Sequence, residues 1–120
     1  MDVTGRMGEE AAARWLEERG HSILSRNWRG GRVELDIVSL DSGGIHFVEV
    51  KSRKAPVMAD PAVNVNEAKR RHIVAAARKW LHSNPEFCSH EVFFDILTVI
   101  FDHTTTHINY YQQAFMPIYA

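Results

Sequence analysis

The fold is decided by residues 33–53, which read VELDIVSLDSGGIHFVEVKSR. Apolar residues recur with the period of two that is typical of β-strands, and the residues between the two apolar halves have the composition of a tight turn. We therefore predict a β-hairpin of residues 33–40 and 45–53, closed by a two-residue turn at Ser42-Gly43 or by a four-residue loop over 41–44. Both turns give the same register.

In this register Asp36 lies across from Glu49, Glu34 lies across from Lys51, and all four share one face of the sheet. Opposed carboxylates repel each other, and Mg²⁺ compensates well because it prefers oxygen ligands and usually takes one or two carboxylates. Lys51 can orient a hydroxide or hold a phosphate oxygen. Alternating charges are also typical of a solvated face with salt bridges. The apolar residues before Glu49 favour the metal site, because they are typical of a strand that is buried on both faces.

Apolar spacing outside the hairpin predicts the remaining elements. The predicted helices cover residues 4–19 and 64–82, and the other predicted strands cover residues 22–28, 91–101 and 106–111. Gly20 should end the first helix, and Asn64 with Glu67 resembles a capping box for the second. The resulting fold class is α/β, a five-stranded mixed sheet flanked by helices in the order α-β-β-β-α-β-β. A right-handed crossover should join strands 45–53 and 91–101 in parallel.

Each helix carries one charged side chain that can reach the sheet. Glu9 borders the apolar stripe of the first helix and can approach the carboxylates, whereas Glu10 points the opposite way. Alternatively, Glu9 is an ordinary acid in the first turn, stabilised by the helix dipole. Lys69 lies within the apolar stripe of the second helix, and it contacts either phosphate or one of the carboxylates.

Basic residues are concentrated in one part of a chain whose net charge is −1. Residues 51–79 contain eight basic and two acidic side chains. We expect Arg53, Lys54, Lys69 and Arg70 to contact nucleic-acid phosphates, with solvated surface charge as the alternative. Asp95 interrupts an apolar strand, so an ion pair or a backbone hydrogen bond should satisfy it.

Length and composition predict one globular domain over residues 1–120, with 45% hydrophobic residues. No apolar run approaches the roughly 20 residues that span a bilayer, and the N-terminus does not resemble a secretory signal, so we expect no membrane and a cytoplasmic location. The single cysteine, Cys88, cannot form an internal disulfide. The seven histidines lack ligand spacing, and we predict no common function for them.

Several motifs resemble those of the YraN family of bacterial proteins, and the match runs over nearly the whole chain. They are Gly8-Glu9-x-x-Ala12, Asn27-x-Arg29, Val33 to Val38, Phe47 to Arg53, Lys69, Phe94-Asp95 and Ala114-Phe115. The most specific of them is Phe-Val-Glu-Val-Lys-x-Arg. Two positions depart from the family pattern, with Val33 in place of a glycine and Phe93 in place of an arginine.

The resemblance implies a restriction-endonuclease-like PD-(D/E)XK core similar to archaeal Holliday junction resolvases. By motif match, Asp36, Glu49 and Lys51 become catalytic and Glu9, Asp36 and Glu49 become ligands of Mg²⁺ or Mn²⁺. Glu34 belongs to the same motif and is a possible accessory residue. The implied partner is nucleic acid, DNA first, and resolvase-like cutting of two strands would require a homodimer.

Three functions follow from these features. The first is a metal-dependent endonuclease that hydrolyses DNA phosphodiester bonds. The second is a catalytically inactive nucleic-acid-binding module of the same fold. The third is an assembly or regulatory protein in which Lys51 and Lys69 neutralise the acidic cluster.

Overall fold

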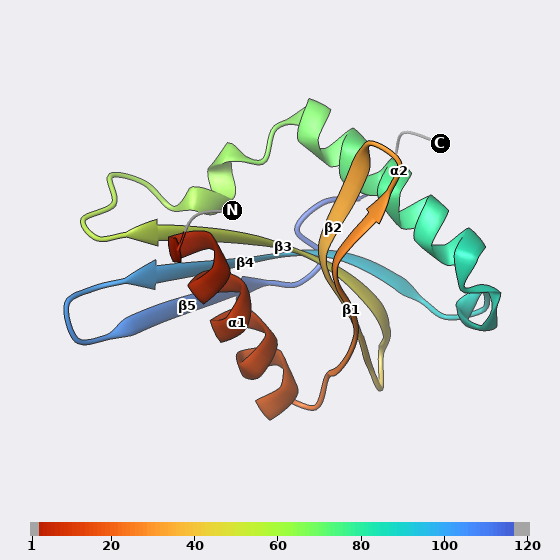
Figure 1. The fold of residues 1–120 in the computed structure, drawn as a ribbon, viewed down its shortest axis with the longest axis horizontal. Coiled ribbons are helices and arrows are strands. Elements are labelled where there is room, and N and C mark those ends of the chain that lie inside the picture. Colours follow the sequence, from red (N-terminus) through yellow and green to blue (C-terminus); the bar gives the residue numbers. More distant parts are fainter. Residues whose placement is uncertain (1–2, 117–120) are drawn as a thin grey trace.

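The computed structural model describes residues 3–116, apart from the side chains at positions 63 and 64. Its elements are α1 (Val3–Glu18), β1 (Ser22–Gly30), β2 (Val33–Asp41), β3 (Gly44–Lys54), η1 (Pro61–Asn64), α2 (Glu67–Ser83), η2 (Pro85–Phe87), β4 (Val92–Phe101) and β5 (Thr106–Tyr111). Apart from two short 3-10 helices, this is the predicted order (Figure 1). Neither α1 nor α2 is long and apolar enough to cross a membrane.

The five strands form one mixed sheet in the order β1-β2-β3-β4-β5. Strands β3 and β4 pair in parallel, and the three other neighbouring pairs are antiparallel. The prediction of parallel strands on either side of α2 is confirmed. Figure 1 shows that the β1–β2 hairpin runs across the direction of β3, β4 and β5, so the sheet is strongly twisted at this edge.

The predicted hairpin register is confirmed over the half of β2 that is nearer the turn. Asp41 pairs with Gly44, which makes Ser42-Gly43 a two-residue turn, and the ladder continues to the pair of Ile37 and Val48. There the pairing of β2 with β3 ends. The prediction that the register extends to Glu34 is therefore wrong, because β2 twists away from β3 before it reaches that residue.

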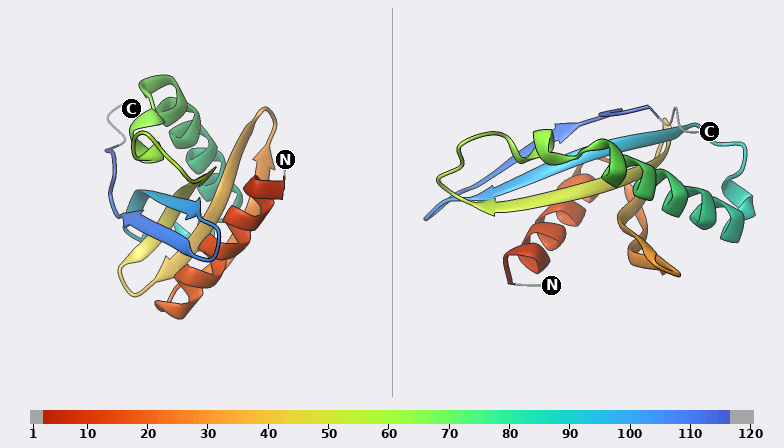
Figure 2. Two further views of the ribbon diagram at one scale, coloured as in Figure 1. Left: turned by 90° about the vertical axis from the view of Figure 1, so that its left-hand side faces the viewer. Right: turned by 90° about the horizontal axis from the view of Figure 1, so that it is seen from above.

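The two helices cover opposite faces of the sheet (Figure 2). On the α2 face, Trp80 and Phe94 pack against Phe47, with ring centroids 5.8 and 5.6 Å away. On the α1 face, Leu16 belongs to a cluster with Val48 and other fully buried apolar residues. Because neighbouring residues of β3 contribute to different clusters, the central strand has no solvated face.

Local geometry explains where the helices end and how α1 approaches the sheet. Gly20 has a φ of +92°, the left-handed conformation that terminates a helix, as predicted. Helix α2 begins after Asn66, whose side chain accepts from the Lys69 N–H at 2.9 Å. The prediction of Asn64 as the cap is wrong, because η1 occupies that position. Gly8 packs so closely on β3 that an added Cβ would lie 1.6 Å from Ser52 Oγ.

Candidate functional site

The candidate site lies where β2 leaves β3. Beyond the last ladder pair, Ile37 and Val48, the backbone N–H of Val50 donates to Asp36 Oδ2 at 2.9 Å. A side-chain hydrogen bond also joins Asp36 to Glu49. The carboxylate of Asp36 thus occupies the space between the separating strands, and the structure brings together the two acids that the register predicted to meet.

Burial and mutual repulsion make this pair of acids reluctant to ionise. Burial, and then the charge of Asp36, raises the pKa of Glu49 to about 7, against the opposing effect of Lys69 and Lys51. Burial also raises the pKa of Asp36, although the Val50 N–H stabilises its charged form. Two neighbouring carboxylates whose pKa values are both raised form a site that a divalent cation would stabilise in its ionised form.

Helix α1 supplies a third acid from the other layer. Glu9 is 6% exposed, and its Oε1 has no hydrogen-bond partner in the described part of the chain. Burial, and then the charge of Asp36, raises the pKa of Glu9 to about 7, although Asn27 hydrogen bonds to the side chain. The neighbouring Glu10 is solvated and pairs with Arg26 at 3.1 Å. The predicted orientations of both acids are confirmed.

Two lysines face the same carboxylate. Lys51 Nζ lies 3.9 Å from Glu49 Oε1, and Lys69 Nζ lies 3.5 Å from the same oxygen. Of the two roles considered for Lys69, the structure shows the contact with a carboxylate. The side chain of Lys69 remains 42% exposed and that of Lys51 19%, so both ammonium groups are also accessible to an anion.

The three acids do not converge on a single point. In residues 3–116, three His, Cys, Asp or Glu ligand atoms lie within 4.8 Å of one another at one place, and that place does not include Glu9, Asp36 or Glu49. Asp36 and Glu49 share a hydrogen bond, whereas Asp36 acts on Glu9 only through its charge. Asp36 and Glu49 are therefore the pair that could hold a cation directly.

Glu34 lies at the edge of this site. It is exposed and pairs with Arg29 at 3.2 Å, not with Lys51. It also borders a cleft of about 420 Å³ between the start of β2 and α2. The cleft is lined by Arg32, Val33, Glu34, Lys69, His72 and Ile73. Lys69 lines this cleft and also contacts Glu49, so it links the cleft with the carboxylate pair.

The other basic residues of the prediction lie in two places. Arg53 and Lys54 are exposed at the end of β3, a few residues beyond the site. Arg70 donates to the Val65 carbonyl at 3.1 Å, and its guanidinium lies 5.4 Å from the ring centre of Phe115. Arg53 and Lys54 remain suited to a phosphate backbone, whereas Arg70 has a role in packing.

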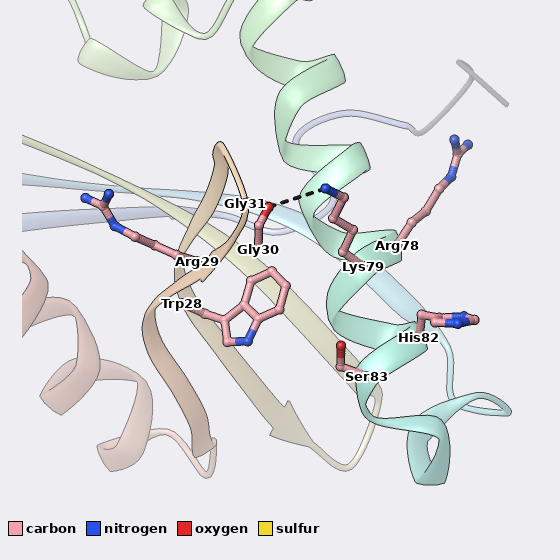
Figure 3. A pocket seen from close by; sticks show the side chains of 8 residues that line it. All are labelled: Trp28, Arg29, Gly30, Gly31, Arg78, Lys79, His82 and Ser83. Atoms are coloured by element: carbon pink, nitrogen blue, oxygen red, sulfur yellow. Dashed lines mark hydrogen bonds between the residues drawn. The ribbon is translucent and has the colours of Figure 1, made fainter.

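An open groove of about 670 Å³ separates the β1–β2 turn from the end of α2 (Figure 3). It is lined by Trp28, Arg29, Gly30, Gly31, Arg78, Lys79, His82 and Ser83. Lys79 donates across it to the Gly30 carbonyl at 3.4 Å. Figure 3 shows that Arg29 and Arg78 extend away from the groove in different directions, so its basic groups do not converge on one anion.

A second cluster of ionisable side chains was missed in the sequence. His21, Asp41 and His46 are the residues whose ligand atoms lie within 4.8 Å of one another. Sequence spacing did not indicate that these two histidines lie together, because it is the turn after α1 that brings His21 onto the sheet. A histidine inside the apolar run of β3 was the signal that a buried partner existed.

Asp95 belongs to the same network. Its Oδ2 lies 2.6 Å from His46 Nδ1 and also accepts a short hydrogen bond from the Tyr110 hydroxyl, while its Oδ1 accepts from the Gln113 N–H at 2.9 Å. The prediction of an ion pair or a backbone hydrogen bond for Asp95 is confirmed. All of its partners are distant in sequence.

Comparison of the sequence with known proteins assigns the chain to a family. The sequence model described as "Uncharacterised protein family UPF0102" matches residues 8–99. A UPF0102 protein of Lawsonia intracellularis is 39% identical over 92% of this chain and 83% of its own length. A UPF0102 protein of Oleidesulfovibrio alaskensis is 49% identical over 68% of this chain, which spans 41% of that relative. The names of these proteins state no activity.

Proposed function

The chain belongs to the family UPF0102, which is the YraN family that its sequence resembles. From the carboxylate cluster we propose that it hydrolyses DNA phosphodiester bonds with Mg²⁺ or Mn²⁺. The observation that carries the proposal is the contact of Asp36 with Glu49, both with a raised pKa, beside Lys51. Perturbed acids that share a site with a cation are more common in functional sites than in structural ion pairs.

The architecture supports the same proposal. A mixed five-stranded sheet between two helices, with an acid of β2 against an acid of β3, a lysine of β3 beside them and an acid of α1 close enough to feel the charge of Asp36, is the arrangement expected of a PD-(D/E)XK core. We extend the proposal to this fold and to its similarity with archaeal Holliday junction resolvases. A cytoplasmic protein that acts as a homodimer on branched DNA would fit it.

The residues fit a hard divalent cation. Asp36 and Glu49 offer oxygen ligands, and the unpartnered buried Oε1 of Glu9 adds negative charge beside them. When bound, the ion supplies Lewis-acid activation of water and of the phosphate oxygens. Mg²⁺ usually takes one or two protein carboxylates, so a pair of acids with a third one nearby is sufficient.

The two lysines bind and orient the substrate. Lys51 holds a non-bridging phosphate oxygen next to Glu49, which fixes the phosphorus near the two acids. Lys69 lies at the opening of the cleft, where it neutralises negative charge on an incoming phosphate. Arg53 and Lys54, at the end of β3, contact phosphates of the DNA backbone. These contacts position the duplex and do not read its sequence.

The test compares an acid of the site with an acid at the surface. Asp36→Asn keeps an acceptor for the Val50 N–H but removes the charge, and Glu10→Gln is the control because Glu10 is solvated and pairs with Arg26. Purified protein should cut linear or branched DNA with Mg²⁺ or Mn²⁺ but not with EDTA. We expect Asp36→Asn to lower the rate about a hundredfold or more and Glu10→Gln to leave it nearly unchanged. Equal cutting by wild type and Asp36→Asn would refute the proposal.

The ion pairs of Glu49 favour a second candidate, a nucleic-acid-binding module without turnover. Lys51 and Lys69 both lie within 4 Å of this acid, so the protein has cations of its own at the site. A binding module should bind DNA without added metal, lose affinity steeply with salt, and keep its affinity in Asp36→Asn. Absence of DNA binding at low salt would instead favour an assembly or regulatory role.

A further inference from the structure

The network around His46 lies on the opposite face of β3 from Glu49. His46 belongs to the α1 face, and its ring centre is 4.8 Å from that of His21, which follows α1. The carboxylate of Asp41 faces one nitrogen of each ring. Asp41 Oδ1 is 2.8 Å from His46 Nε2, and Asp41 Oδ2 is 3.5 Å from His21 Nε2. One nitrogen of each ring thus faces a common carboxylate.

The other nitrogen of each ring has a polar partner of its own. His46 Nδ1 lies 2.6 Å from Asp95 Oδ2, and His21 Nδ1 lies 2.9 Å from Ser39 Oγ. Without metal, His46 Nε2 lies at hydrogen-bond distance from Asp41, so a proton occupies this contact. If a metal ion replaced that proton while each Nδ1–H donates to its own partner, each Nε2 would offer its lone pair to the ion beside Asp41. Histidines that bind metals almost always donate their second N–H in this way, and a carboxylate is a frequent acceptor.

The charge of the network also favours a divalent cation. Asp95 is fully buried, and the side chain of His46 is 1% exposed. The basic partners of Asp41 and Asp95 are histidines, which are charged only when protonated. Neutral rings leave two negative charges at this place. A proton on His46 compensates one of them, whereas a divalent cation compensates both.

We propose that His21 Nε2, His46 Nε2 and Asp41 bind one divalent transition-metal ion of the Zn²⁺ type. Two ligand atoms at 2.0–2.1 Å from a tetrahedral ion lie about 3.3 Å apart. The separations of 2.8 and 3.5 Å from Asp41 are close to this distance, and the whole group lies within 4.8 Å, so the ligand atoms would move closer together as the ion binds. Imidazole ligands suit Zn²⁺ and not Mg²⁺, so this centre is chemically distinct from the Asp36–Glu49 pair.

The same geometry provides an entry path. The side chain of Asp41 is 25% exposed at the turn, next to exposed Ser42 and Gly43, while both histidines are buried. Three protein ligands leave the fourth tetrahedral position open on this side. A bound ion would tie the segment after α1 to β2 and β3, so we expect metal to raise the stability of the whole chain.

The experiment titrates the full chain, freed of metal with EDTA, with Co²⁺ as a spectroscopic probe and then with Zn²⁺. We expect one ion per chain, visible absorption of four- or five-coordinate Co²⁺, displacement of Co²⁺ by Zn²⁺, and a higher melting temperature. Asp41→Asn should weaken binding at least about tenfold, because a neutral amide is a poor ligand. This variant keeps an acceptor for the Gly43 and Gly44 N–H groups, so the turn should be retained.

His103→Asn is the matched control, because His103 is exposed and distant in sequence from the cluster. It should bind Co²⁺ as the wild type does. A six-coordinate Co²⁺ spectrum, substoichiometric binding, or equal affinity in Asp41→Asn would overturn the proposal. So would imidazole NMR signals that show His46 with both nitrogens protonated at neutral pH in the presence of Zn²⁺, because a proton would then occupy the place of the metal.

The outcome does not depend on the nuclease proposal. Asp41→Asn should leave Mg²⁺-dependent cutting of DNA unchanged, and Asp36→Asn should leave Co²⁺ binding unchanged. Loss of both properties in either variant would mean that the variant had unfolded, which circular dichroism detects. In that case Ser39→Ala, which removes the partner of His21 Nδ1, replaces Asp41→Asn and should weaken Co²⁺ binding.

Discussion

Replacing Glu9 with glutamine should stabilise the protein at alkaline pH, when metal is absent. The pKa of Glu9 is about 7 in the folded protein, against an ordinary value of 4.5. The folded state therefore binds more protons than the unfolded state between these values, and stability falls as pH rises through this window. Integrated from pH 5 to pH 8, this one group lowers the free energy of unfolding by about 2.5 kcal/mol.

The assay is urea unfolding in EDTA at pH 5 and pH 8 for the wild type, Glu9→Gln and Glu10→Gln. Glu10 is the matched control, because it is the next residue of the same helix and makes a surface pair with Arg26 worth about 0–1 kcal/mol. The free energy of unfolding of Glu9→Gln, measured relative to that of the wild type, should rise by about 2.5 kcal/mol between pH 5 and pH 8. The difference in the free energy of unfolding between Glu10→Gln and the wild type should be nearly the same at both pH values.

At pH 8, added Mg²⁺ should make the wild type more stable than Glu9→Gln, the reverse of the order in EDTA. The wild type should gain stability as the ion binds, whereas Glu9→Gln has less negative charge near the site and should gain less. An identical pH dependence in Glu9→Gln and Glu10→Gln would refute the reasoning, because it would show that Glu9 ionises as an exposed acid does. Equal stabilisation of both proteins by Mg²⁺ would exclude Glu9 from the metal site.

Three further perturbations test the packing and the charges. Gly8→Ala should destabilise the protein by roughly 1–3 kcal/mol in urea unfolding, and adding Ser52→Gly should recover most of that loss by removing the clashing side chain. Trp80→Ala should lower the free energy of unfolding by about 3–5 kcal/mol, because this ring is buried in the core. Lys69→Met should raise the pKa of Glu49 in an NMR titration, because the charge of Lys69 lowers this pKa. The same variant should reduce the slope of log affinity for DNA against log salt concentration by about 1.

The β2–β3 hairpin could be predicted because two local signals agree. Alternation of apolar residues fixes which side chains face each core, and Ser42-Gly43 fixes the register. A slip of one residue would exchange the buried residues Ile37 and Val38 between the faces, so no other register is compatible with both clusters. The meeting of Asp36 with Glu49 followed from this register alone.

Contacts that depend on twist or on distant segments could not be predicted. Glu34 follows the same alternation as Asp36, yet the pairing of β2 with β3 ends at Ile37, before either acid, and no local pattern marks this point. His21 and His46 meet because Gly20 reverses the chain after α1 by an angle that sequence spacing does not define. Tertiary geometry therefore decided both of these outcomes.

The separation of β2 from β3 also explains why the carboxylate site lies where it does. Elsewhere the sheet is continuous, and it keeps side chains of α1 apart from those of α2. Asp36 occupies the gap, where its charge raises the pKa of Glu9 in one layer and the charge of Lys69 in the other layer lowers the pKa of Asp36 itself. If pairing continued past Ile37, the N–H of Val50 would not need the carboxylate as an acceptor, and the acids of the two layers would lie on opposite sides of a closed backbone. The break in pairing thus leaves the carboxylate of Asp36 between the two layers, in contact with Glu49 and within range of the charges of Glu9 and Lys69.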